Sequence, residues 1–211
     1  MKKKRFWILA LVFVLLLGGA YALYGTLSRT AAHDQLTVQN GGDAGDTSPD
    51  QADSGGETDA AEDAQEPAMA PDFTVYDAEG NEVRLSDYLG KPVVMNFWAS
   101  WCGPCQSEMP DFNAAYQEQG EDVQLLMINM TDGSRETVES ASAFVEGEGY
   151  TFPVFYDTAS EAAITYSAYS LPTTYFIDAE GRAIARATGA IDAETLQKGI
   201  DMITGGTGST S

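Results

Sequence analysis

The chain has 211 residues, of which 32 are acidic, 11 are lysine or arginine, two are cysteine and one is histidine, and its formal net charge is −21. This charge excludes electrostatic binding to nucleic acid or to an anionic membrane surface, because both partners are themselves negative. A CxxC zinc half-site needs two further ligands, and the chain offers only His33.

The first predicted element is a membrane anchor within residues 1–29. Four basic residues, Lys2 to Arg5, precede an uncharged apolar run of 19 residues, Phe6 to Tyr24. At about 1.5 Å per residue, this run is long enough to cross a hydrocarbon core. The basic cluster predicts a cytoplasmic N-terminus and an exported remainder. Ala20-Tyr21-Ala22 also matches a signal-peptidase pattern, so secretion after cleavage near Ala22 is the alternative.

Residues 30–68 differ in composition from the rest of the chain. They include ten acidic residues and no lysine, arginine or aromatic residue. Such a segment does not bury enough apolar surface to offset its ordering entropy. We expect a disordered acidic linker that tethers the following domain, with a partner-binding acidic tail as the alternative.

Residues 69–204 are enough for one domain with its own core, followed by a flexible tail at 205–211. Short apolar strands alternate with amphipathic helices, which predicts an α/β sheet covered on both faces. A helix is expected to start at Asp132-Gly133-Ser134 and to expose Glu136. The other expected elements are a hairpin of Phe73–Tyr76 with Val83–Leu85, strands at Val123–Met130 and Phe152–Tyr156, and a last helix capped by Asp192.

The chemistry concentrates at Trp101-Cys102-Gly103-Pro104-Cys105, which contains both cysteines. The preceding run, Pro92–Ala99, predicts a buried strand, and Gly103-Pro104 opens a helix. The N–H groups and the dipole at a helix N-terminus stabilise a thiolate, so we expect a lowered pKa and a nucleophilic role for Cys102. Cys105, one turn along and more buried, is expected to resolve the mixed disulfide.

The two cysteines allow other interpretations. A purely structural disulfide across three residues closes too small a loop to restrain the unfolded chain much. A peroxidatic cysteine would need a threonine and an arginine nearby, whereas Ala99-Ser100-Trp101 precedes Cys102. A non-catalytic redox-sensing module is an alternative of a different class, which requires inert cysteines or a high thiol pKa.

The run from Asn96 to Cys105 resembles the active-site strand and helix of the thioredoxin superfamily. Glu108-Met109-Pro110, the segment Leu171–Asp178 and the hairpin Gly181-Arg182…Gly189 resemble the TlpA-like and ResA-like membrane-anchored thiol-disulfide oxidoreductases. The resemblance implies a thioredoxin-like α/β fold with an N-terminal β-hairpin and a central insertion. It also implies disulfide exchange with other proteins outside the bacterial cytoplasmic membrane, and no cofactor beyond a redox-active Cys102–Cys105 disulfide.

The same resemblance assigns a substrate-binding surface beside the cysteines. It implies a cis peptide bond between Leu171 and Pro172, which presents the backbone of Leu171 to an extended substrate segment. Trp101, Gly103 and Pro104 complete this surface.

Glu108 is the third predicted catalytic residue. Asn96 stands where thioredoxin has a buried aspartate, so the candidate proton acceptor for Cys105 moves to Glu108. An ordinary solvated glutamate on an exposed helix face is the alternative.

The expected activity is that of a protein-disulfide reductase, because the dipeptide Gly103-Pro104 resembles that of the reducing thioredoxins. The resemblance implies substrates such as apocytochrome c and re-reduction by a membrane electron donor. We expect a monomer. A disulfide oxidase or isomerase is the alternative within the same chemistry.

Overall fold

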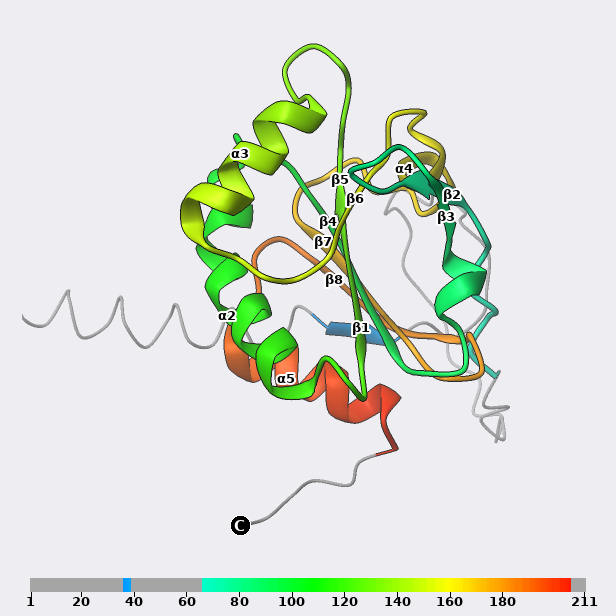
Figure 1. Ribbon diagram of the computed structural model, residues 1–211. Helices are drawn as coiled ribbons and strands as arrows, with labels where there is room; N and C mark the ends of the chain where they lie inside the picture. The colour runs from blue at the N-terminus through cyan, green and yellow to red at the C-terminus, as the bar shows by residue number, and fades with distance from the viewer. Residues whose placement is uncertain (1–35, 39–65, 206–211) are drawn as a thin grey trace, which may run out of the picture.

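The computed structural model describes residues 36–38 and 66–205, which form one eight-stranded mixed sheet in the order β1-β8-β7-β4-β5-β6-β2-β3 (Figure 1). The strands are β1 (Leu36–Val38), β2 (Thr74–Tyr76), β3 (Glu82–Arg84), β4 (Val93–Trp98), β5 (Gln124–Asn129), β6 (Val154–Tyr156), β7 (Thr173–Ile177) and β8 (Ala183–Thr188). The helices are the 3-10 helix η1 (Leu85–Tyr88) and the α-helices α2 (Gly103–Gln119), α3 (Val138–Glu148), α4 (Glu161–Thr165) and α5 (Ala193–Ile203).

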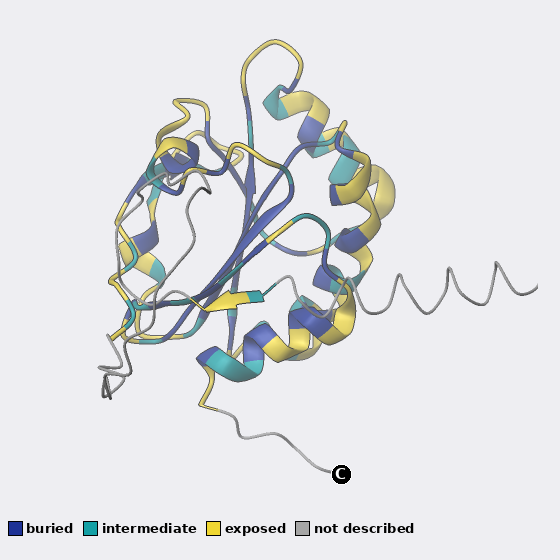
Figure 2. Ribbon diagram, turned by 180° about the vertical axis from the view of Figure 1, so that it is seen from behind, coloured by how far each residue is buried: buried dark blue, intermediate teal, exposed yellow. Residues whose placement is uncertain are grey.

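The central strand β4 shows why the sheet is covered on both faces. All six of its residues are buried, and successive side chains point to opposite faces. Val94 and Trp98 belong to the core formed with α2, α3 and α5, while Val93, Met95 and Phe97 belong to the core formed with η1 and α4. Figure 2 shows the buried strands between these layers, with the exposed residues on the outer helix faces. The predicted α/β architecture is therefore confirmed.

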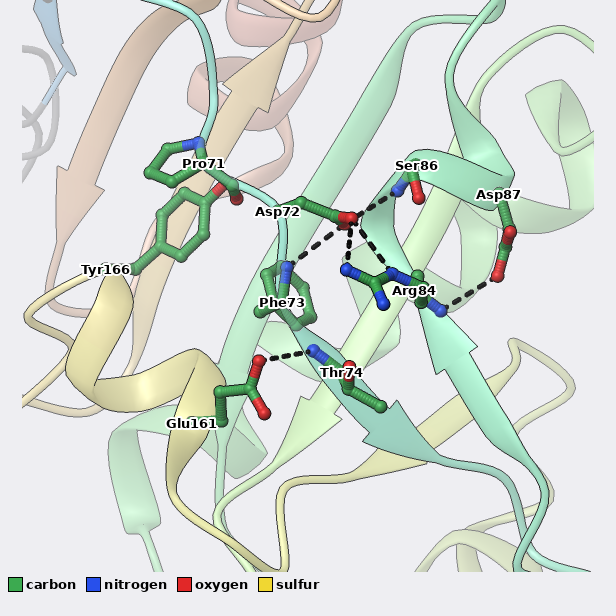
Figure 3. Close-up of polar contacts among 9 residues, drawn as sticks. All are labelled: Pro71, Asp72, Phe73, Thr74, Arg84, Ser86, Asp87, Glu161 and Tyr166. Atoms are coloured by element: carbon green, nitrogen blue, oxygen red, sulfur yellow. Dashed lines mark hydrogen bonds and ion pairs between the residues drawn. The ribbon is translucent and has the colours of Figure 1, made fainter.

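The predicted N-terminal hairpin consists of β2 and β3. Asp72, which precedes β2, forms polar contacts with the end of β3 and the start of η1 (Figure 3). The Asp72 carboxylate accepts from the Ser86 N–H at 3.1 Å and pairs with the Arg84 guanidinium at 2.9 Å. Glu161 of α4 accepts from the Thr74 N–H at 3.1 Å, which attaches α4 to β2. These contacts hold the hairpin against the sheet edge at β6, which β2 joins through one antiparallel pair.

Strand β1 departs from the expected linker. Leu36–Val38 pairs antiparallel with Ala185–Ala187 of β8, and Met69 makes an antiparallel bridge to Arg182 just before that strand. The expectation of disorder is not met for these three residues, because the open edge of β8 supplies backbone partners that composition does not reveal. The rest of the linker up to residue 65 lies outside the described residues.

No helix within residues 36–38 and 66–205 is long and apolar enough to cross a membrane. The predicted anchor at Phe6–Tyr24 and the cleavage pattern at Ala20–Ala22 lie outside the described residues, as does the tail from residue 206.

Candidate active site

Cys102 and Cys105 form a disulfide where the chain passes from β4 into α2. The S–S distance is 2.07 Å and the Cα atoms are 5.2 Å apart. Cys102 is the N-cap of α2, and its Sγ accepts a hydrogen bond from the Cys105 N–H at 3.2 Å. The predicted helix start at Gly103-Pro104 is confirmed, since a proline has no N–H to leave unpaired in the first turn.

The two cysteine residues differ in their access to solvent. Cys105 is completely buried, whereas Cys102 retains 5% exposure. Cys102 lines an open groove of about 610 Å³, and Cys105 does not. The groove is lined by Trp101, Cys102, Gly103, Pro104, Met130, Asp132, Arg135, Ala168, Tyr169 and Leu171.

Four of the five predicted substrate-binding residues line this groove, whereas Pro172 is buried and is not part of the lining. Trp101, Gly103, Pro104 and Leu171 all line it. The Leu171–Pro172 peptide bond is cis, as the resemblance implies. Within the described part of the chain, neither the N–H nor the C=O of Leu171 has a hydrogen-bond partner. This backbone is therefore available to a bound segment.

Other groove residues were missed by the sequence reasoning. Met130, Asp132 and Arg135 come from the loop after β5, and Ala168 and Tyr169 come from the loop after α4. Tyr169 is 76% exposed, an unusual position for a large aromatic side chain. No periodic pattern marks these loop residues, so only the assembled fold brings them to the cysteines.

Glu108 is buried, with 1% exposure, so the alternative of a solvated surface glutamate is wrong. Its Oε1 accepts from Asn96 Nδ2 at 2.8 Å, and its Oε2 accepts from the Ile191 N–H at 3.0 Å. Burial raises the pKa of Glu108 to about 7, although the hydrogen bonds from Ile191 and Asn96 act in the opposite direction. Cys105 lies three residues earlier on the same buried face of α2.

Glu136 corrects a second expectation. The sequence pattern predicts Glu136 on the solvent-exposed face of a helix that starts near Asp132. In the structure α3 begins at Val138, and Glu136 lies in the preceding loop and is completely buried. Thr137 is the N-cap and forms a capping box with Ser140, which sets the helix start. Asp132 instead closes the preceding loop by accepting from backbone N–H groups.

The buried Glu136 carboxylate holds the segment that leads into Cys102. Its Oε1 accepts from the Ser100 N–H at 2.8 Å and from Asn129 Nδ2 at 2.7 Å, while its Oε2 accepts from Ser100 Oγ at 2.7 Å. One side chain therefore connects the end of β5 to the loop between β4 and α2. This positioning role was missed because the sequence pattern placed Glu136 in solvent.

The described residues contain no group of three or more His, Cys, Asp and Glu side chains that could hold a metal ion. The site consists of a CxxC disulfide at a helix N-terminus, a cis Leu171–Pro172 peptide bond and a groove lined by both Cys102 and Leu171. These features define a thioredoxin-like thiol-disulfide oxidoreductase.

Comparison with known proteins agrees with this class. The model of the AhpC/TSA family matches residues 68–185, and the chain belongs to this family. It is 39% identical over 139 residues to the thiol-disulfide oxidoreductase ResA of Geobacillus thermodenitrificans, which covers 64% of this chain and 76% of that protein. The predicted resemblance to ResA-like enzymes and the predicted oxidoreductase activity are thus confirmed.

Solved structures give the same picture of the fold. A putative thiol:disulfide interchange protein DsbE from Chlorobium tepidum is 28% identical, with a TM-score of 0.57 over 64% of this chain and 94% of that one. StoA from Bacillus subtilis is 26% identical, with a TM-score of 0.55 over 64% of this chain and 99% of that one. The thioredoxin-like fold is therefore confirmed.

Proposed function

We propose that this protein reduces disulfides in exported proteins on the outer side of the cytoplasmic membrane. The observation that carries the proposal is the position of Cys102, the one cysteine of the pair that lines the groove, at the N-terminus of α2. An open groove of about 610 Å³ has room for a segment of a protein chain. The relation to ResA-named oxidoreductases supports the same chemistry.

The reaction proceeds in two exchanges. The Cys102 thiolate attacks one sulfur of the substrate disulfide, and the other substrate sulfur leaves as a thiolate. The Cys105 thiol then loses its proton and attacks Cys102 Sγ, which expels the second substrate sulfur. Two electrons have passed to the substrate, and the Cys102–Cys105 disulfide present in the structure is restored.

Glu108 is the proton acceptor for Cys105 in this scheme. A carboxyl with a pKa of about 7 exists in both protonation states near neutral pH, which suits a general base. Glu108 and Cys105 share the buried face of α2, where the hydrogen bonds from Asn96 and Ile191 fix the carboxylate.

The substrate segment binds in an extended form along the cis-proline loop. The free N–H and C=O of Leu171 pair with its backbone, while the exposed side chains of Trp101 and Tyr169 contact its side chains. Backbone pairing does not depend on side-chain identity, so this mode accepts many disulfide-containing partners.

The location and the redox partners extend the proposal. Phe6–Tyr24 anchors the chain, as a monomer, in the bacterial cytoplasmic membrane with residues 69–204 outside. A membrane electron donor returns the disulfide to the dithiol. Apocytochrome c, whose haem-attachment cysteines must be reduced, is the substrate that the resemblance suggests.

The reduction potential of the Cys102–Cys105 pair tests the direction of transfer. We expect a value nearer to that of thioredoxin, about −270 mV, than to that of DsbA, about −120 mV. A value near the DsbA potential would favour the oxidase alternative. Alkylation by iodoacetamide as a function of pH tests the non-catalytic alternative, which requires a Cys102 pKa at or above the ordinary thiol value.

Membrane fractionation tests the location. The full-length protein should stay in the membrane fraction after a carbonate wash. A soluble form that begins near Leu23 would instead show secretion after cleavage.

A further inference from the structure

Arg135 contacts Trp101, the residue that precedes the attacking cysteine. The Arg135 guanidinium carbon is 3.6 Å from the centroid of the Trp101 ring, a cation–π contact. Trp101 immediately precedes Cys102 and is 42% exposed. Both Arg135 and Trp101 line the groove that contains Cys102.

The positive charge of Arg135 helps to lower the pKa of nearby Asp132, but its guanidinium has no direct ionic partner within the described residues. Arg135 is exposed and forms no ion pair with any of them. A guanidinium has five N–H donors in its plane, and stacking on an indole uses the face of that plane and leaves its edge free. The edge is thus available to a ligand in the groove.

Among the described residues, Asp132 is the only other charged residue that lines the groove. Its Oδ1 accepts from the N–H groups of Ser134, Arg135 and Glu136 at 2.7, 2.8 and 3.0 Å. These peptide dipoles compensate much of the Asp132 charge in place. Arg135 therefore has the less compensated charge of the two.

The groove is less acidic than the rest of the domain. Residues 69–204 carry 22 acidic and six basic residues, a net charge of −16, whereas the groove lining has one charge of each sign. Salt screens charges beyond about 8 Å at physiological ionic strength. A group bound at Arg135 consequently experiences this guanidinium more than the distant acidic surface.

We propose that Arg135 is a specificity residue that binds a carboxylate side chain next to the cysteine of a substrate protein. Trp101 holds the guanidinium by its face, and the N–H edge pairs with the carboxylate as the adjacent sulfur approaches Cys102. This inference deepens the proposed function, since it rests on disulfide exchange at Cys102 but not on the direction of that exchange.

The test compares two disulfide-bonded peptides of the same sequence, with Asp or Lys at the position beside one cysteine. Stopped-flow measurements with the full-length protein in detergent give the second-order rate constant of exchange for each peptide. We expect the wild-type protein to react about three- to tenfold faster with the Asp peptide, as one charge-assisted contact of up to about 1.4 kcal/mol allows. Arg135→Gln should remove this preference, and Arg135→Glu should reverse it.

Lys198→Glu is the matched control, because it changes the net charge by the same amount on the exposed face of α5 and away from the groove. It should keep the Asp preference. A folding defect slows both peptides alike, so the ratio of the two rate constants reports recognition alone.

Three results would overturn the proposal: equal rate constants for the two peptides with the wild-type protein, an Asp preference that Arg135→Gln leaves unchanged, or a reversal by Lys198→Glu as large as that by Arg135→Glu. A reduction potential near that of DsbA would instead contradict the proposed direction and leave the ratio unchanged. The two failures are therefore distinguishable.

Discussion

Asn96 Nδ2 donates a 2.8 Å hydrogen bond to Glu108 Oε1, whereas the buried Asn96 Oδ1 has no hydrogen-bond partner among the described residues. A buried acceptor without a donor costs free energy. Protonation of Glu108 creates an O–H donor, and a half-turn of the Asn96 amide brings Oδ1 to meet it. The pair can thus accommodate both states of a carboxyl whose pKa is about 7.

Asn96→Ala should raise the pKa of Glu108 further, by about one unit, because it removes a hydrogen bond to the charged form. The check is a titration of the carboxyl carbon by NMR. Thr174→Val is the matched control, since Thr174 Oγ1 accepts from the same Asn96 Nδ2 at 3.0 Å but forms no hydrogen bond with the Glu108 carboxylate within the described residues. If the pKa of Glu108 is unchanged in Asn96→Ala, Asn96 does not influence the protonation of Glu108.

Glu108→Gln should change how stability depends on pH. The pKa of Glu108 is raised from 4.5 to about 7 by folding, so the native state holds this proton more tightly than the unfolded state. Wild-type stability therefore falls as the pH rises from about 4.5 to 7, by up to about 3 kcal/mol from this one group. The variant lacks the titration, so its free energy of unfolding relative to wild type should increase across that window.

Urea unfolding of the oxidised proteins at pH 4, 5.5 and 8 measures this difference. Glu118→Gln, at an exposed position on α2, provides the control. Its free energy of unfolding should depend on pH in the same way as that of the wild type. Parallel curves for Glu108→Gln as well would mean that Glu108 titrates at an ordinary pKa.

The same substitution should alter the thiol chemistry in two opposite ways. Above pH 7 the ionised Glu108 disfavours a nearby thiolate, so Glu108→Gln should lower the pKa of Cys102, by up to about one unit. Loss of the base for Cys105 should slow resolution of the mixed disulfide. Thiolate absorbance against pH and single-turnover reduction of a model disulfide measure the two effects. If neither changes, Glu108 has no part in the reaction.

Cys105→Ala should accumulate mixed disulfides with partner proteins, because Cys102 lines the groove while the resolving thiol is missing. Cys102→Ala should accumulate none, since Cys105 is completely buried. Non-reducing electrophoresis after acid quenching shows the adducts. Equal trapping by both variants would contradict the assignment of nucleophile and resolver.

Glu136→Ala should lower the free energy of unfolding by about 2–4 kcal/mol, because it leaves the Ser100 N–H and Asn129 Nδ2 without their buried acceptor. Glu136→Gln keeps one carbonyl oxygen for these donors and should lose less. Glu146→Ala, at an exposed position on α3, is the control and should unfold like the wild type. If the alanine and glutamine variants lose the same free energy of unfolding, the hydrogen bonds accepted by Glu136 do not account for its effect on stability.

The sequence by itself determined the elements whose signals are local. The unbroken apolar run of β4 predicted a strand buried on both faces, and the Gly103-Pro104 pair predicted the start of α2. Asp192 was recognised as the N-cap of the last helix, where its side chain accepts from the Thr195 N–H. These signals are readable because the residues that interact are within a few positions of one another.

Only the tertiary structure decided where the acidic side chains lie. Glu108 and Glu136 are both buried, whereas Glu118 and Glu139 are exposed. The Glu108-Met109-Pro110 motif marked Glu108 as a candidate but left a solvated side chain as the alternative, and Glu136 was expected in solvent. The donor from Ile191 to Glu108 comes from 83 residues away, and the donor from Ser100 to Glu136 comes from 36 residues away.

The strand β1 and the groove depended on tertiary contacts in the same way. Leu36–Val38 found its partner on β8 near the other end of the chain, and Arg135 and Tyr169 reached Cys102 from two separate loops. Burial of a charged or polar group is favourable only when hydrogen-bond partners replace water. In this fold those partners come from segments that are far apart in the sequence, so no local pattern encodes them.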